Sequence, residues 1–194
     1  MMSEQELRQA LVDYGMRLLD ADLVQGTWGN LSVRLDETHM LVTPSGLDYD
    51  KLAASDMAKV ELSTLEWEGP HKPTSEKSLH QAIYLLRPEI NAVIHTHSDA
   101  CSVLAAARAP LPAKTEELSR MFGGTVAVAR YGLPGTKALA KHTAAALGPR
   151  FAALMAHHGA VACGGSLDAA FTRCMALENA ARAYIGERQP EAND

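Results

Sequence analysis

The residues from Ile90 to Ser98, Ile-Asn-Ala-Val-Ile-His-Thr-His-Ser, form the stretch that most restricts how this chain can fold. The apolar run predicts a buried strand, and successive side chains of a strand point to opposite faces. His95 and His97 should therefore share one face, while Ile94 and Thr96 pack on the other. Because buried polar rings without partners are costly, the pair indicates either hydrogen-bonded core histidines or a metal site.

Composition and charge narrow the class of protein. The 194 residues are 47% hydrophobic and 21% charged, which suits one globular domain over residues 1–186, followed by a polar tail over residues 187–194. The net charge of −5 argues against general binding to nucleic acid or to a membrane surface. No Cys-x-x-Cys pair is present, and no apolar stretch approaches about 18 residues, so we expect a cytoplasmic protein.

Periodicity predicts a chain that alternates helices and strands, an α/β protein. Apolar spacings of three and four predict helices over residues 4–24, 74–86, 99–109, 114–121, 136–147 and 167–185. Short apolar or alternating runs predict strands over residues 31–35, 39–43, 60–67 (as a pair), 90–98, 125–129, 151–155 and 160–163.

Histidines at three separated places could meet around one metal ion. They are the His95/His97 pair, one of the adjacent His157 and His158, and His80 in a predicted helix. Catalytic zinc usually keeps three protein ligands and one open position, and neutral imidazole suits it. Spacing alone does not choose between His157 and His158. The remaining histidines fit solvated positions: His39, His71 and His142.

Several motifs, in this order, resemble the class II aldolase/adducin family, and in particular the L-fuculose-1-phosphate aldolases within it. The similarity spans roughly residues 7–185 and rests on Gly26–Arg34, Thr43–Gly46, Pro73–Glu76 with His80 following, His95–His97, Gly135–Thr136 and His158–Gly159. The resemblance implies a three-layer α/β/α fold with a central, mainly antiparallel sheet flanked by helices. It also implies a homotetramer with active sites near the subunit interfaces.

Residue by residue, the resemblance makes His95, His97 and His158 the ligands of Zn²⁺, with Mn²⁺ or Co²⁺ as other divalent possibilities. Glu76 matches the acidic residue that transfers a proton beside the metal, although helix capping alone would also explain an acidic residue there. A phosphate site is implied at Asn30, Ser45, Gly46, Thr74 and Ser75. The implied enzyme is a lyase that splits a phosphorylated ketose into dihydroxyacetone phosphate and an aldehyde, through a metal-stabilised enediolate.

The chain also departs from the pattern of the aldolases. These enzymes carry a proton-donating tyrosine near the segment that here reads Pro112-Ala-Lys-Thr-Glu-Glu117, and no tyrosine is present. Glu117, or less favourably Glu116, could take that role, although an exposed charged helix face explains both. An L-ribulose-5-phosphate 4-epimerase, a sugar-acid phosphate decarboxylase and a non-catalytic adducin-like module are the alternatives. The epimerase has aspartate where this chain has Glu76, and the adducin head lacks the metal ligands, so aldol cleavage is preferred.

Overall fold

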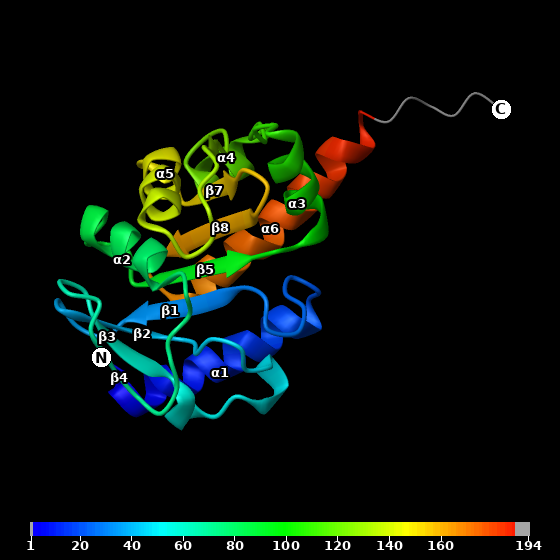
Figure 1. Cartoon of the computed structure of the whole chain (residues 1–194). Helices are drawn as coiled ribbons and strands as arrows, with labels where there is room; N and C mark the ends of the chain where they lie inside the picture. The colour runs from blue at the N-terminus through cyan, green and yellow to red at the C-terminus, as the bar shows by residue number, and fades with distance from the viewer. Residues whose placement is uncertain (1, 189–194) are drawn as a thin grey trace.

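The computed structural model describes residues 2–188, and they are built around one eight-stranded sheet (Figure 1). The strand order is β4-β3-β2-β1-β5-β8-β7-β6, and every neighbouring pair is antiparallel except β6 with β7. This confirms the expected mainly antiparallel sheet. The strands are β1 (Asn30–Arg34), β2 (His39–Val42), β3 (Ala58–Glu61), β4 (Trp67–Glu68), β5 (Ala92–Thr96), β6 (Val128–Ala129), β7 (Ala152–Met155) and β8 (Gly159–Gly164).

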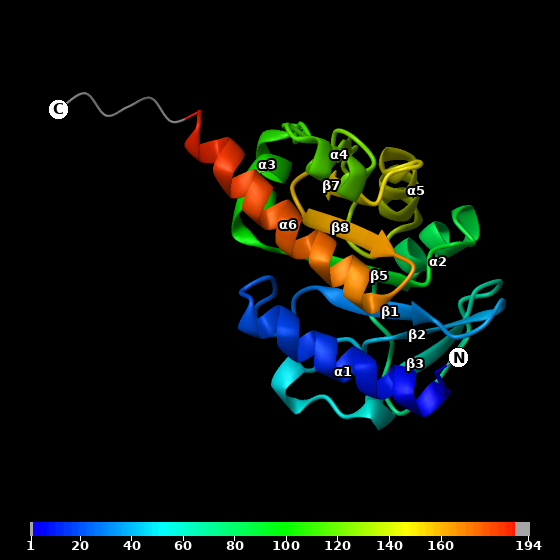
Figure 2. The same cartoon turned by 180° about the vertical axis from the view of Figure 1, so that it is seen from behind.

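Helices cover both faces of the sheet, which confirms the expected three-layer α/β/α class (Figures 1 and 2). One face packs against α1 (Glu4–Asp20), α3 (Asp99–Ala107), α4 (Glu116–Phe122) and α6 (Leu167–Gly186). The other face packs against α2 (Lys77–Leu86) and α5 (Lys137–Leu147). Two short 3₁₀ turns, η1 (Tyr49–Lys51) and η2 (Ala54–Asp56), lie between β2 and β3.

The central strand β5 alternates between the two cores, as its sequence predicts. Ala92 and Ile94 belong to the hydrophobic cluster on the α1/α6 side, whereas Val93 belongs to the cluster on the α2/α5 side. Because side chains alternate, His95 lies on the face covered by α2 and α5. The sheet therefore directs the first histidine towards the helix that follows Glu76.

Some predicted boundaries were wrong. Helix α1 ends at Asp20 rather than residue 24, since Asp22 takes a left-handed conformation with φ of 54° and the chain turns back. The apolar pattern continues because Leu23 and Val24 are buried after the turn. The strand expected over residues 125–129 is only Val128–Ala129.

Two further expectations concern membranes and the tail. None of the helices in residues 2–188 combines the length and apolarity that a bilayer crossing needs. The predicted polar tail, residues 187–194, lies almost wholly outside the described residues, which end at position 188.

Candidate active site

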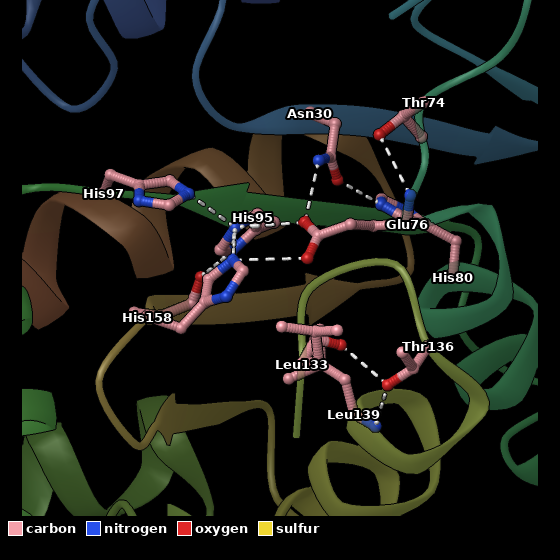
Figure 3. A network of polar contacts seen from close by, with 11 residues as sticks. Asn30, Thr74, Glu76, His80, His95, His97, Leu133, Thr136, Leu139 and His158 are labelled. Carbon is pink, nitrogen blue, oxygen red and sulfur yellow. Dashed lines mark hydrogen bonds and ion pairs between the residues drawn. The ribbon is translucent and has the colours of Figure 1, made fainter. Parts of the chain in front are cut away.

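Three imidazole rings from two separate parts of the chain meet at one end of the sheet (Figure 3). His95 is the fourth residue of β5, His97 follows the end of that strand, and His158 lies in the turn between β7 and β8. The Nε2 atom of His95 is 2.9 Å from that of His97 and 3.0 Å from that of His158. His95 and His97 thus lie on the same face, as the sequence predicts.

The turn between β7 and β8 separates His158 from its neighbour His157. His157 has φ of 58° and is exposed, where it accepts a hydrogen bond from Arg108 over 3.2 Å. Gly159, which follows His158, has no room for a side chain, since an added Cβ would lie 2.3 Å from the Thr96 carbonyl oxygen. Close packing of β8 on β5 therefore brings His158, and not His157, to the other two rings.

Hydrogen bonding defines the protonation of the central ring. His95 Nδ1 lies 2.8 Å from the carbonyl oxygen of Ala160. A carbonyl only accepts, so Nδ1 carries the proton and Nε2 offers its lone pair to the cluster. Burial lowers the pKa of His95, and burial also lowers the pKa of His97 to about 3, so both rings are neutral at pH 7.

The carboxylate of Glu76 contacts this histidine cluster. It is 5% exposed, with Oε2 at 3.2 Å from His95 Nε2 and Oε1 at 3.2 Å from His158 Nε2. Asn30 donates to Oε2 over 3.1 Å, whereas Oε1 has no hydrogen-bond partner. Burial opposes ionisation, but the neighbouring His95, His158 and Asn30 outweigh it and lower the pKa of the Glu76 carboxyl.

The donor set fits a divalent cation. Two ring nitrogens and a carboxylate oxygen surround the Nε2 lone pair of His95 at 2.9–3.2 Å. This lone pair can accept only one hydrogen bond, so protons alone cannot satisfy all three contacts. A single cation among the three rings would use all three lone pairs and offset the buried negative charge. His95, His97 and His158 could therefore hold a metal ion.

A cavity of about 360 Å³ opens beside the histidine cluster, and every residue of the predicted phosphate site lines it. Ser45, Gly46 and Ser75 border it from loops. Thr74 is buried and its hydroxyl accepts a hydrogen bond from the Glu76 amide over 3.3 Å. Thr74 and Ser75 lie just before the N-terminus of α2, a position that favours an anion.

Asn30 is more constrained than its predicted phosphate role suggests. Its Oδ1 is 2.5 Å from His80 Nε2, and its Nδ2 donates to Glu76. One amide N–H therefore remains for a ligand in the cavity.

Two sequence-predicted residues lie apart from the histidine cluster. His80 is completely buried, but its ring contacts Asn30 and Ser32, so its inclusion among the possible metal ligands was wrong. The helical spacing from Glu76 brings His80 near the site without turning its ring towards the three clustered histidines. Glu117 is exposed in the first turn of α4 and does not border the cavity.

The cavity also includes residues that the sequence did not single out. Trp28 is 62% exposed, and its ring centroid lies 5.6 Å from that of His97. Pro134 borders the same space. A large aromatic residue in a Gly-rich loop is the signal that the sequence offers for Trp28, and a turn alone would also explain such a loop.

Comparison with known proteins agrees with this arrangement. Residues 9–185 match the family described as the class II aldolase and adducin N-terminal domain. A 5-methylthioribulose-1-phosphate/5-deoxyribulose-1-phosphate aldolase of Rhodospirillum rubrum is 38% identical, over 92% of this chain and 80% of that protein. An L-fuculose phosphate aldolase of Escherichia coli is 34% identical, over 95% and 85%. A solved L-fuculose 1-phosphate aldolase superposes with a TM-score of 0.90 at 36% identity, covering 97% of this chain and 91% of the other. The chain belongs to the class II aldolase and adducin family.

Proposed function

We propose that this protein is a zinc-dependent aldehyde-lyase that splits a phosphorylated ketose into dihydroxyacetone phosphate and an aldehyde. The observation that carries the proposal is the contact of a buried carboxylate, Glu76, with two of three converging imidazoles at the edge of a hydroxyl-lined cavity. Related proteins named as aldolases of ketose phosphates support the same reaction class.

In this proposal His95, His97 and His158 hold the metal ion through Nε2. Neutral imidazole nitrogens suit Zn²⁺, and Mn²⁺ or Co²⁺ can occupy such a site as well. When bound, the cation supplies Lewis acidity beside the reacting carbon atoms. Because His95 donates through Nδ1 to Ala160, its ring orientation is already set in the folded chain.

Glu76 is the proposed proton carrier. Its Oε2 atom is held by Asn30, which leaves Oε1 as the atom that can take and return a proton. In the cleavage direction, Oε1 takes the proton of the hydroxyl group that becomes the aldehyde oxygen, and the electron pair of the broken carbon–carbon bond stays on the dihydroxyacetone fragment. A proton delivered from Oε1 to that carbon completes dihydroxyacetone phosphate.

The phosphate is proposed to bind where Ser45, Gly46, Thr74 and Ser75 border the cavity. Hydroxyl and amide donors near a helix N-terminus can hold an anion without a positively charged side chain. An acidic protein with net charge −5 needs such a local site to attract a phosphorylated substrate.

We also propose a homotetramer, in which Glu117 acts at the active site of a neighbouring subunit. Its exposed position outside the cavity of its own chain supports a role in trans rather than in cis. Mixing Glu76→Gln chains with Glu117→Gln chains tests this. In randomly mixed tetramers, about a quarter of the active sites would then contain both an intact Glu76 and an intact Glu117. Mixtures with no more activity than either variant alone would contradict the assignment.

The test of the reaction uses zinc-loaded protein and a panel of ketose 1-phosphates that includes L-fuculose and 5-deoxyribulose derivatives. We expect release of dihydroxyacetone phosphate. Glu76→Gln should keep its zinc but lose about a hundred- to a thousandfold in kcat. The matched control is Glu66→Gln, which alters an exposed glutamate outside the active-site cavity.

Other reaction products would contradict the proposed aldol cleavage. Stereochemical inversion of a pentulose phosphate without fragments would identify an epimerase. Carbon dioxide release from a 3-keto sugar-acid phosphate, without aldol cleavage, would identify a decarboxylase. A Glu76→Gln variant that turns over at the parent rate would remove Glu76 from the mechanism.

A further inference from the structure

A continuous chain of buried polar groups leads from the interior of α2 to Glu76. The Tyr84 hydroxyl is 2.8 Å from Ser32 Oγ, which is 2.6 Å from His80 Nδ1. His80 Nε2 is 2.5 Å from Asn30 Oδ1, and Asn30 Nδ2 is 3.1 Å from Glu76 Oε2. All five residues are at most 5% exposed. The last steps of the chain are visible in Figure 3.

The regular spacing of two secondary-structure elements builds this chain. Glu76, His80 and Tyr84 are four residues apart, so they line one side of α2. Asn30 and Ser32 are two residues apart in β1, so they share one face of the sheet. The two rows interleave, and each strand residue bridges two residues of the helix row.

The ionised carboxylate of Glu76 at one end fixes which group donates and which accepts in every hydrogen bond of this row of polar residues. An ionised carboxylate only accepts, so Asn30 must present its NH₂ group to Glu76 and its Oδ1 to His80. His80 must then donate from Nε2 and accept at Nδ1, where the Ser32 hydroxyl donates. Ser32 Oγ in turn accepts from the Tyr84 hydroxyl. Burial lowers the pKa of His80 to about 3, which is consistent with a neutral ring that carries one proton.

We propose that His80 is a positioning residue that acts through Asn30 on the proton-transferring carboxylate of Glu76. The proposal rests on the proposed function of Glu76. His80 Nε2–H holds the Asn30 amide in the one orientation that donates to Oε2. Without that donor the amide is free to turn its own oxygen towards the carboxylate, and Oε1 is no longer held at the cluster.

Kinetics of matched variants test this role. His80→Leu removes the donor and should lower kcat about ten- to a hundredfold, the range for groups that orient active-site residues, with KM and zinc content unchanged. His80→Gln can still donate to Asn30 and should recover most of that loss. The control Ile83→Ala removes a fully buried side chain of the same helix outside the polar chain. It should destabilise the protein and leave kcat at the parent value.

Two results would overturn the proposal. One is a kcat for His80→Leu equal to that of Ile83→Ala at matched stability. The other comes from nitrogen-15 NMR of the zinc-loaded parent protein, with the His80 signal assigned from its loss in His80→Gln. We expect a neutral ring protonated at Nε2, and a ring protonated at Nδ1 alone would have no N–H to donate to Asn30. The NMR result does not depend on turnover, so it stands apart from a failure of the proposed reaction.

Discussion

Glu178 of α6 offers the clearest test of how the packing of helices supports the proposed metal site. This carboxylate of α6 is 5% exposed and accepts hydrogen bonds from the backbone amides of Ala100 and Cys101, over 2.9 and 3.0 Å. Those amides belong to the first turn of α3, the helix that begins just after His97. A side chain of α6 thus caps the helix next to a proposed metal ligand.

The cost of removing this cap follows from its contacts. A hydrogen bond to a charged group contributes about 1.5–3 kcal/mol, and the two bonds share one carboxylate, so Glu178→Ala should lower the free energy of unfolding by about 3 kcal/mol. For a chain of 194 residues this corresponds to a fall in Tm of about 6–12 °C. Arg182 contacts the same carboxylate over 3.2 Å but its side chain is 72% exposed, so Arg182→Ala is a control with little expected effect.

The assay is thermal unfolding at equal protein concentration and zinc loading. Burial raises the pKa of Glu178, but the amides of Ala100 and Cys101 outweigh it, so the pKa lies below its ordinary value of 4.5. The carboxylate therefore stabilises the fold above about pH 4.5, and this contribution is lost as the pH falls through the lowered pKa. The difference in Tm between the parent and Glu178→Ala should therefore shrink as the pH falls below about 4.5. A gap under about 2 °C at pH 7 would refute the reasoning.

Three further changes test other parts of the site. Gly159→Ala places a Cβ 2.3 Å from the Thr96 carbonyl oxygen, so it should lower both Tm and bound zinc, measured by calorimetry and elemental analysis. Trp28→Ala should lower kcat/KM roughly tenfold for a ketose phosphate with an apolar tail, without loss of zinc, because it removes an aromatic wall of the cavity. Restoring zinc to chelated protein at 100 times its Kd should add about 2.7 kcal/mol to the unfolding free energy. The same addition to His158→Ala should give a much smaller gain.

The local parts of the site could be predicted from sequence, because they depend on a single element. Alternation along one strand was enough to place His95 and His97 on one face. The choice between His157 and His158 was different, since it depends on the left-handed residue His157 and on the close approach of Gly159 to β5. The sequence alone left that choice open, and the resemblance to the family was needed to prefer His158.

His80 shows where pattern reasoning lacked information. A histidine one helical turn after Glu76 is compatible with either a metal ligand or a hydrogen-bonded core residue. What decides between them is Ser32, a small polar residue in a distant strand that takes the Nδ1 side of the ring. No spacing within α2 indicates that partner.

The register between β1 and β5 joins the row of buried polar residues to the histidine cluster. Asn30 pairs with His95 and Ser32 pairs with Val93, so both polar residues of β1 share the face that His95 occupies. A slip of one residue would turn Asn30 and Ser32 to the opposite face, into the apolar cluster beneath α1 and α6. Glu76 would lose its donor and His80 both of its partners. The buried Leu31 and Val33 of β1 lie in that cluster, so the same hydrophobic alternation that stabilises the sheet also holds Asn30 beside the proposed active centre.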